Sequence, residues 1–319
     1  MQDRGCPFGK MCALMLPPLL VVAGATRTDA QTKAYVANTS ANVVSVIDTA
    51  SDALTGTIPV GDNPSALAVT PDGKWLYVMT TGGEVEVVDT TLQTIAATIT
   101  VGSTGDIAMT PDGTRAYVAA GLVYVIDTAT NTVVHSFAAE TAPIADVSQT
   151  ASTVAISPDG TRAYVGVVIF NFTGGNFSAG GNLVVVDTAS EAVTGAIYLF
   201  SLLPGSIALT PDGSRAYVGV QAQWVNTGYG AGFLPGRQII VIDTITKSIG
   251  ASIDLGADGP NWTQQNTAAG IGVTPDRSAV YAAVPRIGVV EVASVKTAIV
   301  ARLTTAINMT TKPASVARV

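Results

Sequence analysis

The sequence predicts an all-β fold, because three short patterns recur in the same order along the chain. The first is a turn, Thr-Pro-Asp-Gly or a close variant, at residues 70–73, 110–113, 157–160, 210–213 and 274–277. The second is a strand centred on a tyrosine, which follows each turn at Tyr77, Tyr117, Tyr164, Tyr217 and Tyr281. The third is an apolar strand that ends in Asp-Thr, as at Asp48-Thr49 and Asp243-Thr244. Repeats of about 40 residues or more with four strands each are typical of β-propeller blades.

Each repeat is expected to contain the same four strands. The repeat around Tyr77 has an inner strand before the turn, the tyrosine strand 75–78, the Asp-Thr strand 85–90 and a short outer strand at 97–101. Proline and aspartate favour the corner of a tight turn, and glycine adopts the left-handed conformation that follows. The repeated aspartates are therefore interpreted as turn residues. Arg277 occupies the glycine position of the last copy and should carry about 1 kcal/mol of strain.

The two ends of the chain complete one repeat. Residues 34–36 already form a tyrosine strand, so the first copy lacks its inner strand, and residues 312–318 align with the inner-strand segment 63–69. We therefore expect a six-bladed β-propeller of four-stranded antiparallel blades, in which the C-terminal strand joins the N-terminal blade and closes the ring. Closure would also shield strand edges that otherwise favour aggregation.

The segment Ala34-Tyr35-Val36-Ala37-Asn38, the Pro-Asp-Gly-x-x-x-Tyr-Val runs and the Val-Ile-Asp-Thr endings resemble the YVTN-family β-propeller repeat. The resemblance covers residues 34–319, and such repeats occur in exported bacterial proteins and archaeal surface-layer proteins. It implies the fold but no single function, since family members include non-enzymatic binding propellers. Similar repeats also occur in lactonase-like proteins and in haem d1-associated or quinoprotein subunits. No catalytic residue carries over, because the matching positions are turn and packing residues.

Residues 1–30 are typical of an export signal peptide. Arg4 and Lys10 form a positive start, an apolar core follows, and small residues favour cleavage after Ala25 or Ala30. We therefore expect a periplasmic, secreted or cell-envelope protein whose mature chain, residues 31–319, is a single propeller domain.

Composition excludes several kinds of chemistry. The cysteines, Cys6 and Cys12, fall in the expected signal peptide, so the mature protein would have no disulfide and no thiol. The one histidine, His135, lies in an outer strand, which argues against a multi-histidine metal site and a Ser-His-Asp triad. A net charge of −7 without a basic cluster argues against nucleic acid as a partner. The longest apolar stretch, residues 11–25, is too short for a spanning helix of about 20 residues, so no transmembrane segment is predicted.

The insertions in the repeat pattern predict a binding surface. All of them, at 138–152, 168–182, 221–238 and 256–269, fall on the side of the second-to-third turns and the blade-to-blade loops. Loops on one side of a rigid scaffold commonly carry binding residues, although neutral drift in tolerant loops is an alternative. Aromatic residues recur in them, namely Phe170, Phe172, Phe177, Trp224, Tyr229, Phe233 and Trp262. The residues predicted to bind a ligand are Asp106, Asp146, Phe172, Trp224, Tyr229, Arg237 and Trp262.

The preferred function is therefore an exported propeller without chemistry of its own, which binds a small molecule, a glycan or an envelope protein. The alternative is a metal-dependent lactonase- or lyase-like enzyme at the channel mouth, where Asp106 and the nearby Asp62 and Asn63 are candidate calcium ligands. A structural envelope protein that self-associates is a third hypothesis. No catalytic residue and no cofactor other than calcium is assigned, and the oligomeric state is left open.

Overall fold

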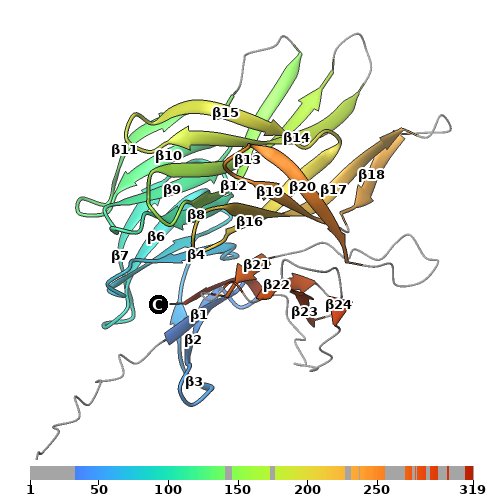
Figure 1. Cartoon of the computed structure of the whole chain (residues 1–319). Coiled ribbons are helices and arrows are strands. Elements are labelled where there is room, and N and C mark those ends of the chain that lie inside the picture. Colours follow the sequence, from blue (N-terminus) through green and yellow to red (C-terminus); the bar gives the residue numbers. More distant parts are fainter. Residues whose placement is uncertain are drawn as a thin grey trace, which may run out of the picture. The chain divides into compact units, whose positions relative to one another are not determined.

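The computed structural model describes residues 33–140, 146–172, 177–226, 231–236, 238–255, 270–274, 277, 279–284, 288–293, 300–301 and 313–318. Within these ranges every regular element is a β-strand (Figure 1), and all belong to one compact unit, Thr32–Val319. None of the described residues forms a helix with the length and apolarity that a membrane span requires. The expected signal peptide at residues 1–30 lies outside the described part of the chain.

The described strands form six antiparallel sheets, which we number in chain order. Sheet 1 has the order β25 (Pro313–Arg318), β1 (Lys33–Asn38), β2 (Val43–Asp48) and β3 (Ala53–Pro59). Sheet 2 has the order β4 (Ala66–Val69), β5 (Trp75–Met79), β6 (Glu84–Asp89) and β7 (Thr94–Thr100). Sheet 3 has the order β8 (Asp106–Met109), β9 (Arg115–Ala120), β10 (Leu122–Asp127) and β11 (Thr132–Phe137).

The remaining sheets follow the same plan, with one additional strand in sheet 5. Sheet 4 has the order β12 (Val147–Ile156), β13 (Arg162–Asn171), β14 (Ser178–Asp187) and β15 (Ala192–Tyr198). Sheet 5 has the order β16 (Leu202–Leu209), β17 (Arg215–Asn226), β19 (Gln238–Asp243) and β20 (Ser248–Asp254), and β18 (Ala231–Pro235) pairs with β17. Sheet 6 has the order β21 (Gly270–Val273), β22 (Ala279–Val284), β23 (Gly288–Ala293) and β24 (Val300–Ala301).

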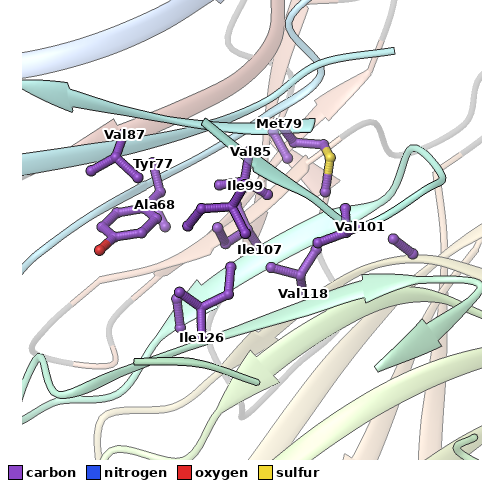
Figure 2. Packing of buried hydrophobic residues seen from close by; sticks show 13 residues of the cluster. Ala68, Tyr77, Met79, Val85, Val87, Ile99, Val101, Ile107, Val118 and Ile126 are labelled. Atoms are coloured by element: carbon purple, nitrogen blue, oxygen red, sulfur yellow. The ribbon is translucent and has the colours of Figure 1, made fainter. Parts of the chain in front are cut away.

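Successive sheets pack face to face through apolar side chains. Figure 2 shows the cluster between sheets 2 and 3, in which Tyr77 and Val87 of sheet 2 lie near Ile107 and Ile126 of sheet 3. Comparable clusters join sheets 1 and 2, 3 and 4, 4 and 5, and 5 and 6. The first strands of neighbouring sheets also lie against one another, as β4 does against β8. The sequence's prediction of an all-β protein is confirmed, and this succession of four-stranded sheets is propeller-like.

The C-terminal strand completes sheet 1. β25 pairs antiparallel with β1, with Ala34 opposite Arg318, Tyr35 opposite Ala317 and Val36 opposite Val316. It takes the first-strand position, the place that the alignment of residues 312–318 with 63–69 predicts. Residues 33–38 and 313–318 therefore share one sheet although almost the whole chain separates them.

The repeated tyrosine lies in the second strand of each sheet, and in sheets 1 to 5 it packs in the apolar cluster shared with the next sheet. Tyr35, Tyr77, Tyr117 and Tyr164 are almost completely buried. The hydroxyl of Tyr77 donates a hydrogen bond to Asn131 Oδ1 at 2.6 Å, in the last turn of sheet 3. Burial, with a smaller effect of the Asp127 charge, raises the pKa of Tyr77 to about 12, so the hydroxyl remains a donor at neutral pH.

The turn motifs form the hydrogen bonds that their residue types favour. The Thr70 hydroxyl donates to Asp72 Oδ1 at 2.6 Å, the Lys74 amide donates to the same oxygen at 3.1 Å, and Gly73 has a φ of 71°. The Thr90 hydroxyl of the Asp-Thr ending donates to the Gly73 carbonyl at 2.6 Å. The hydrogen bond from the threonine hydroxyl is the main cause that lowers the pKa of Asp72. The aspartates of this motif therefore stabilise the turns by accepting hydrogen bonds within them.

Arg277 replaces the turn glycine and keeps its backbone conformation. Its φ is 61°, in the left-handed region that side chains with a Cβ adopt only at a cost. Its guanidinium forms an ion pair with Asp212, in the equivalent turn of sheet 5. The strained conformation expected from the sequence is thus present, and a contact between adjacent turns accompanies it.

Candidate ligand-binding site

Two hairpins extend beyond the repeat plan and lie next to each other. In sheet 4, β13 and β14 pair without interruption from Arg162 opposite Asp187 to Asn171 opposite Ser178. In sheet 5, the first part of β17, from Arg215 to Gly219, pairs with β19, and its last part, from Ala222 to Asn226, pairs with β18. Both hairpins belong to the connection between second and third strands, where the sequence has insertions.

A group of five aromatic rings, which we call the aromatic cluster, joins these hairpins. Its members are Phe170, Phe172, Phe177, Trp224 and Phe233. Phe177 and Trp224 have ring centroids 4.6 Å apart in an edge-to-face arrangement, and Trp224 and Phe233 have centroids 4.9 Å apart. Phe172 lies 5.3 Å from Phe177, and Phe170 lies 6.0 Å from it. Such distances and tilts are those of favourable ring pairs.

The aromatic cluster has a buried base and an exposed top. Beneath it, Val168, Ala179 and Leu203 form a small core against which Phe170 and Trp224 pack. Phe172, Phe233 and Phe177 remain 54%, 47% and 36% exposed, respectively. Packing between the hairpins therefore accounts for only part of this aromatic surface.

Glycines permit the close approach that holds the hairpins together. A Cβ on Gly180 would lie 2.0 Å from the Phe200 carbonyl oxygen, and one on Gly181 would lie 2.6 Å from the Leu202 carbonyl oxygen. The Phe200 oxygen belongs to the connection between β15 and β16, and the Leu202 oxygen to the first residue of β16, so β14 can approach this backbone only with glycine at both positions. These two glycines thus allow the β13–β14 hairpin, which carries part of the aromatic cluster, to lie close to sheet 5.

Three of the predicted binding residues come together here. Phe172 and Trp224 belong to the aromatic cluster, and the Phe172 amide donates a hydrogen bond to the Asp146 carbonyl at 2.8 Å. Asp146 is exposed and has a φ of 62°. This backbone contact places an exposed acidic residue next to Phe172. Phe170, Phe177 and Phe233 are also in the cluster although the predicted set omits them. The register of β17 and β18 places Phe233 opposite Trp224, and the ring of Phe177 contacts that of Trp224.

Asp106 lies at the start of β8 and connects two sheets. Its Oδ2 accepts hydrogen bonds from the Thr153 hydroxyl at 2.7 Å and the Val154 amide at 3.2 Å, both in β12. Its Oδ1 accepts a hydrogen bond from the Ile107 amide at 2.9 Å. Burial raises the pKa of Asp106, and the hydrogen bonds act in the opposite direction. The geometry indicates a structural carboxylate that joins the first strands of sheets 3 and 4.

Asp62 and Asn63 also bond to neighbouring loops. Asn42 Nδ2 donates to Asp62 Oδ1 at 3.0 Å, and the Asn63 amide donates to Asn42 Oδ1 at 2.9 Å. They connect the first turn of sheet 1 to the loop before sheet 2. Among the described residues, no group of three or more His, Cys, Asp or Glu side chains could hold a metal ion.

The remaining residues considered in the sequence do not belong to the aromatic cluster as the structure describes it. Tyr229, Arg237 and Trp262 lie outside the described residues. His135, in β11, contacts the carboxylate of Glu191 in the last turn of sheet 4 through its Nδ1. It is thus an inter-sheet contact at the outer rim, where the sequence places it.

No protein-family model matches the chain, and no curated protein matches it. Among solved structures, the chain is similar to the hydrazine synthase of Kuenenia stuttgartiensis, with 24% sequence identity and a TM-score of 0.63. The match covers 81% of this chain and 72% of that one. A likeness at this level of identity shows the fold alone.

Proposed function

We propose that this protein is an exported six-bladed β-propeller of the YVTN-like kind, which binds a neutral ligand at the aromatic cluster. The observation that carries the proposal is the group of rings on two extended hairpins, three of which remain substantially exposed. Exposed rings that contact one another form a rigid surface at little cost in conformational entropy.

The ring closure in this proposal rests on sheet 1 and on the tyrosines. β25 brings the end of the chain onto β1, and Tyr217 is only 3% exposed between sheets 5 and 6. Tyr281 of sheet 6 is 39% exposed. Packing of sheet 6 against sheet 1 would bury Tyr281 in the way that the other five tyrosines are buried.

The chemistry of the cluster favours a glycan or an apolar small molecule. Ring faces bind the C–H faces of sugars and apolar groups. Asp146 is exposed and its main-chain carbonyl contacts the Phe172 amide, so its carboxylate would be available to accept hydrogen bonds from ligand hydroxyl groups. A protein partner would use the same rings. The alternative metal-dependent enzyme at Asp106 has less support, because both oxygens of that carboxylate already accept hydrogen bonds from the chain.

The test is a binding screen with matched variants. Neutral oligosaccharides and non-ionic amphiphiles serve as probes, and hits are measured by calorimetric titration. The Phe172→Ala/Phe177→Ala double variant should weaken a hit at least about tenfold, since each ring contact contributes about 1 kcal/mol. Tyr198→Ala is the control, because Tyr198 is a 60% exposed aromatic residue in β15 outside the cluster. Equal affinity of the double variant, or no hit in either class of probe, would contradict the proposal.

A further inference from the structure

Five of the six described outer strands share a feature that protects their edges. β3, β7, β11, β15 and β20 each pair with the third strand of their sheet through a register irregularity. The extra residue of each bulge follows from the pairing: Thr55, Ala96, Val134, Thr194 and Gly250. A bulge twists an edge strand and interrupts the row of free backbone groups that another strand could pair with. These five edges are therefore poor templates for association.

The edge of β18 lacks this protection. β18 pairs with β17 over five consecutive residue pairs, Ala222 opposite Pro235 to Asn226 opposite Ala231, without a register irregularity. Among the described strands, none pairs with its other side. The strand contains no charged residue. A regular, uncharged and unpaired edge favours addition of another strand.

The direction of the backbone groups of β18 follows from β17. The Trp224 amide donates to the Ser201 carbonyl at 2.9 Å, on the β16 side of β17. Trp224 and Phe233 are therefore a non-hydrogen-bonded pair, in which each residue directs its N–H and C=O away from the other strand. Phe233 thus presents both groups on the free edge, and so do Ala231 and Pro235, except that proline has no N–H.

We propose that β18 pairs antiparallel with β18 of a second copy of this chain, about a two-fold axis at Phe233. The Phe233 N–H of each copy would donate to the Phe233 carbonyl of the other. The Ala231 N–H would donate to the Pro235 carbonyl of the other copy. The missing proline N–H leaves only the Ala231 carbonyl without a partner in this arrangement.

The observations favour a second copy over an unrelated peptide. An antiparallel pair about a two-fold axis uses the same surface twice, so a strand that fits itself needs no other partner. The absence of charge in β18 avoids the like-charge repulsion that the axis would otherwise create. Phe233, 47% exposed, lies at the centre of the contact and extends the aromatic cluster of one copy toward that of the other.

The first test measures the oligomeric state of the full chain by sedimentation velocity over a wide range of concentration. The wild type should associate to a dimer. Phe233→Pro removes the outward N–H and no hydrogen bond to β17, so it should remain monomeric with an unchanged circular dichroism spectrum. Phe233→Ala retains the N–H and should still dimerise, about tenfold more weakly because the ring is lost. A monomeric wild type, a dimeric Phe233→Pro, or complete loss of the dimer in Phe233→Ala would overturn the proposal.

A cross-link provides a second measurement that does not depend on the proline variant. In a Cys6→Ser/Cys12→Ser background, Phe233→Cys places two thiols across the axis. A hydrogen-bonded antiparallel pair separates Cα atoms by about 5.5 Å, within the range of disulfides. Phe233→Cys should form a disulfide-linked dimer on mild oxidation, and Ile245→Cys, an exposed turn position away from β18, should not. Equal cross-linking of both variants would contradict the interface.

The dimer is independent of the proposed ligand. The Phe172→Ala/Phe177→Ala double variant alters rings on the β13–β14 hairpin and leaves the β18 backbone intact. It should lose ligand binding and retain the dimer. A dimer without any ligand would contradict only the proposed function, and a monomer that binds ligand would contradict only the dimer.

Discussion

At the residue scale, the turns explain why threonine, aspartate and glycine recur. The hydroxyl of Thr110 donates to Asp112 Oδ1 at 2.6 Å, and Gly113 has a φ of 71°, as in the turn at residues 70–73. Hydrogen bonds from Thr110 and Thr114 are the main causes that lower the pKa of Asp112. Adjacent turns also come close, because a Cβ added to Gly113, Gly160 or Gly213 would lie 2.9, 3.3 or 3.5 Å from the proline of the turn in the preceding sheet.

Substitution of two turn glycines should separate backbone strain from steric contact. A Cβ on Gly113 would lie 2.9 Å from Pro71 Cδ, whereas one on Gly213, at a φ of 67°, would lie 3.5 Å from Pro158 Cδ. Gly213→Ala should therefore lower the free energy of unfolding by about 1 kcal/mol through strain alone. Gly113→Ala should lower it by about 2 kcal/mol or more, because the proline must also move. Urea unfolding measures both, and equal losses would show that neighbouring turns do not constrain each other.

At the scale of the element, the second strand of each sheet determines how sheets stack. In sheets 1 to 5 its tyrosine is buried in the face-to-face core. The hydroxyls of Tyr77 and Tyr117 also donate to the outer turn of the next sheet, at Asn131 and Thr188. The outer strands have the opposite character, with exposed residues and a bulge in each of the five sheets where they are described fully. The second strands thus specify how the sheets stack, and the outer strands limit pairing with strands of other molecules.

Removal of two tyrosine hydroxyls should have unequal effects. Tyr77 donates at 2.6 Å to Asn131 Oδ1, and Tyr117 donates at 3.3 Å to the Thr188 carbonyl. Tyr77→Phe should lower the free energy of unfolding by about 1 to 2 kcal/mol, since the hydrogen bond is short and its donor is buried. Tyr117→Phe is the matched control and should cost less than about 1 kcal/mol. The midpoint of urea unfolding measures the difference, and a larger loss for Tyr117→Phe would refute the assignment.

At the scale of the whole molecule, the chain's two ends meet in sheet 1. β25 covers the edge of β1 through pairs such as Val36 opposite Val316. β1 in turn packs through Tyr35 and Ala37 against sheet 2, so the terminal strand supports the first interface of the stack. Stability of the first interface therefore depends on a strand that lies far from β1 in the sequence.

Deletion of residues 313–319 should destabilise the protein strongly. The truncated chain loses the β25–β1 ladder and exposes an unprotected edge of β1. We expect the melting temperature to fall by about 10 °C, equivalent to several kcal/mol for a chain of this size, and aggregation to increase. Deletion of Val319 alone, which lies beyond β25, is the control. Scanning calorimetry gives the answer, and an unchanged melting temperature in the longer deletion would exclude a structural role for β25.

The candidate site was partly predictable. Insertions and aromatic residues in the sequence indicate the hairpins, and Phe172, Trp224 and Asp146 indeed lie together there. Phe233 joins them because it pairs with Trp224 across β17 and β18, a relation that depends on strand register. Asp106 links sheets 3 and 4 through its hydrogen bond from the Thr153 hydroxyl, a contact that forms only when the two sheets pack together. Composition carries no information about such contacts.

The sequence by itself determined the repeat, the four strands of each unit, the turn chemistry and the pairing of residues 313–318 with the first strand. Those features are local or periodic, so they follow from residue type and spacing. Only the tertiary structure decided which rings gather over sheets 4 and 5 and that β18 pairs with β17 without a bulge. Both depend on register and on packing between sheets, where a shift of one residue would turn each side chain to the opposite face.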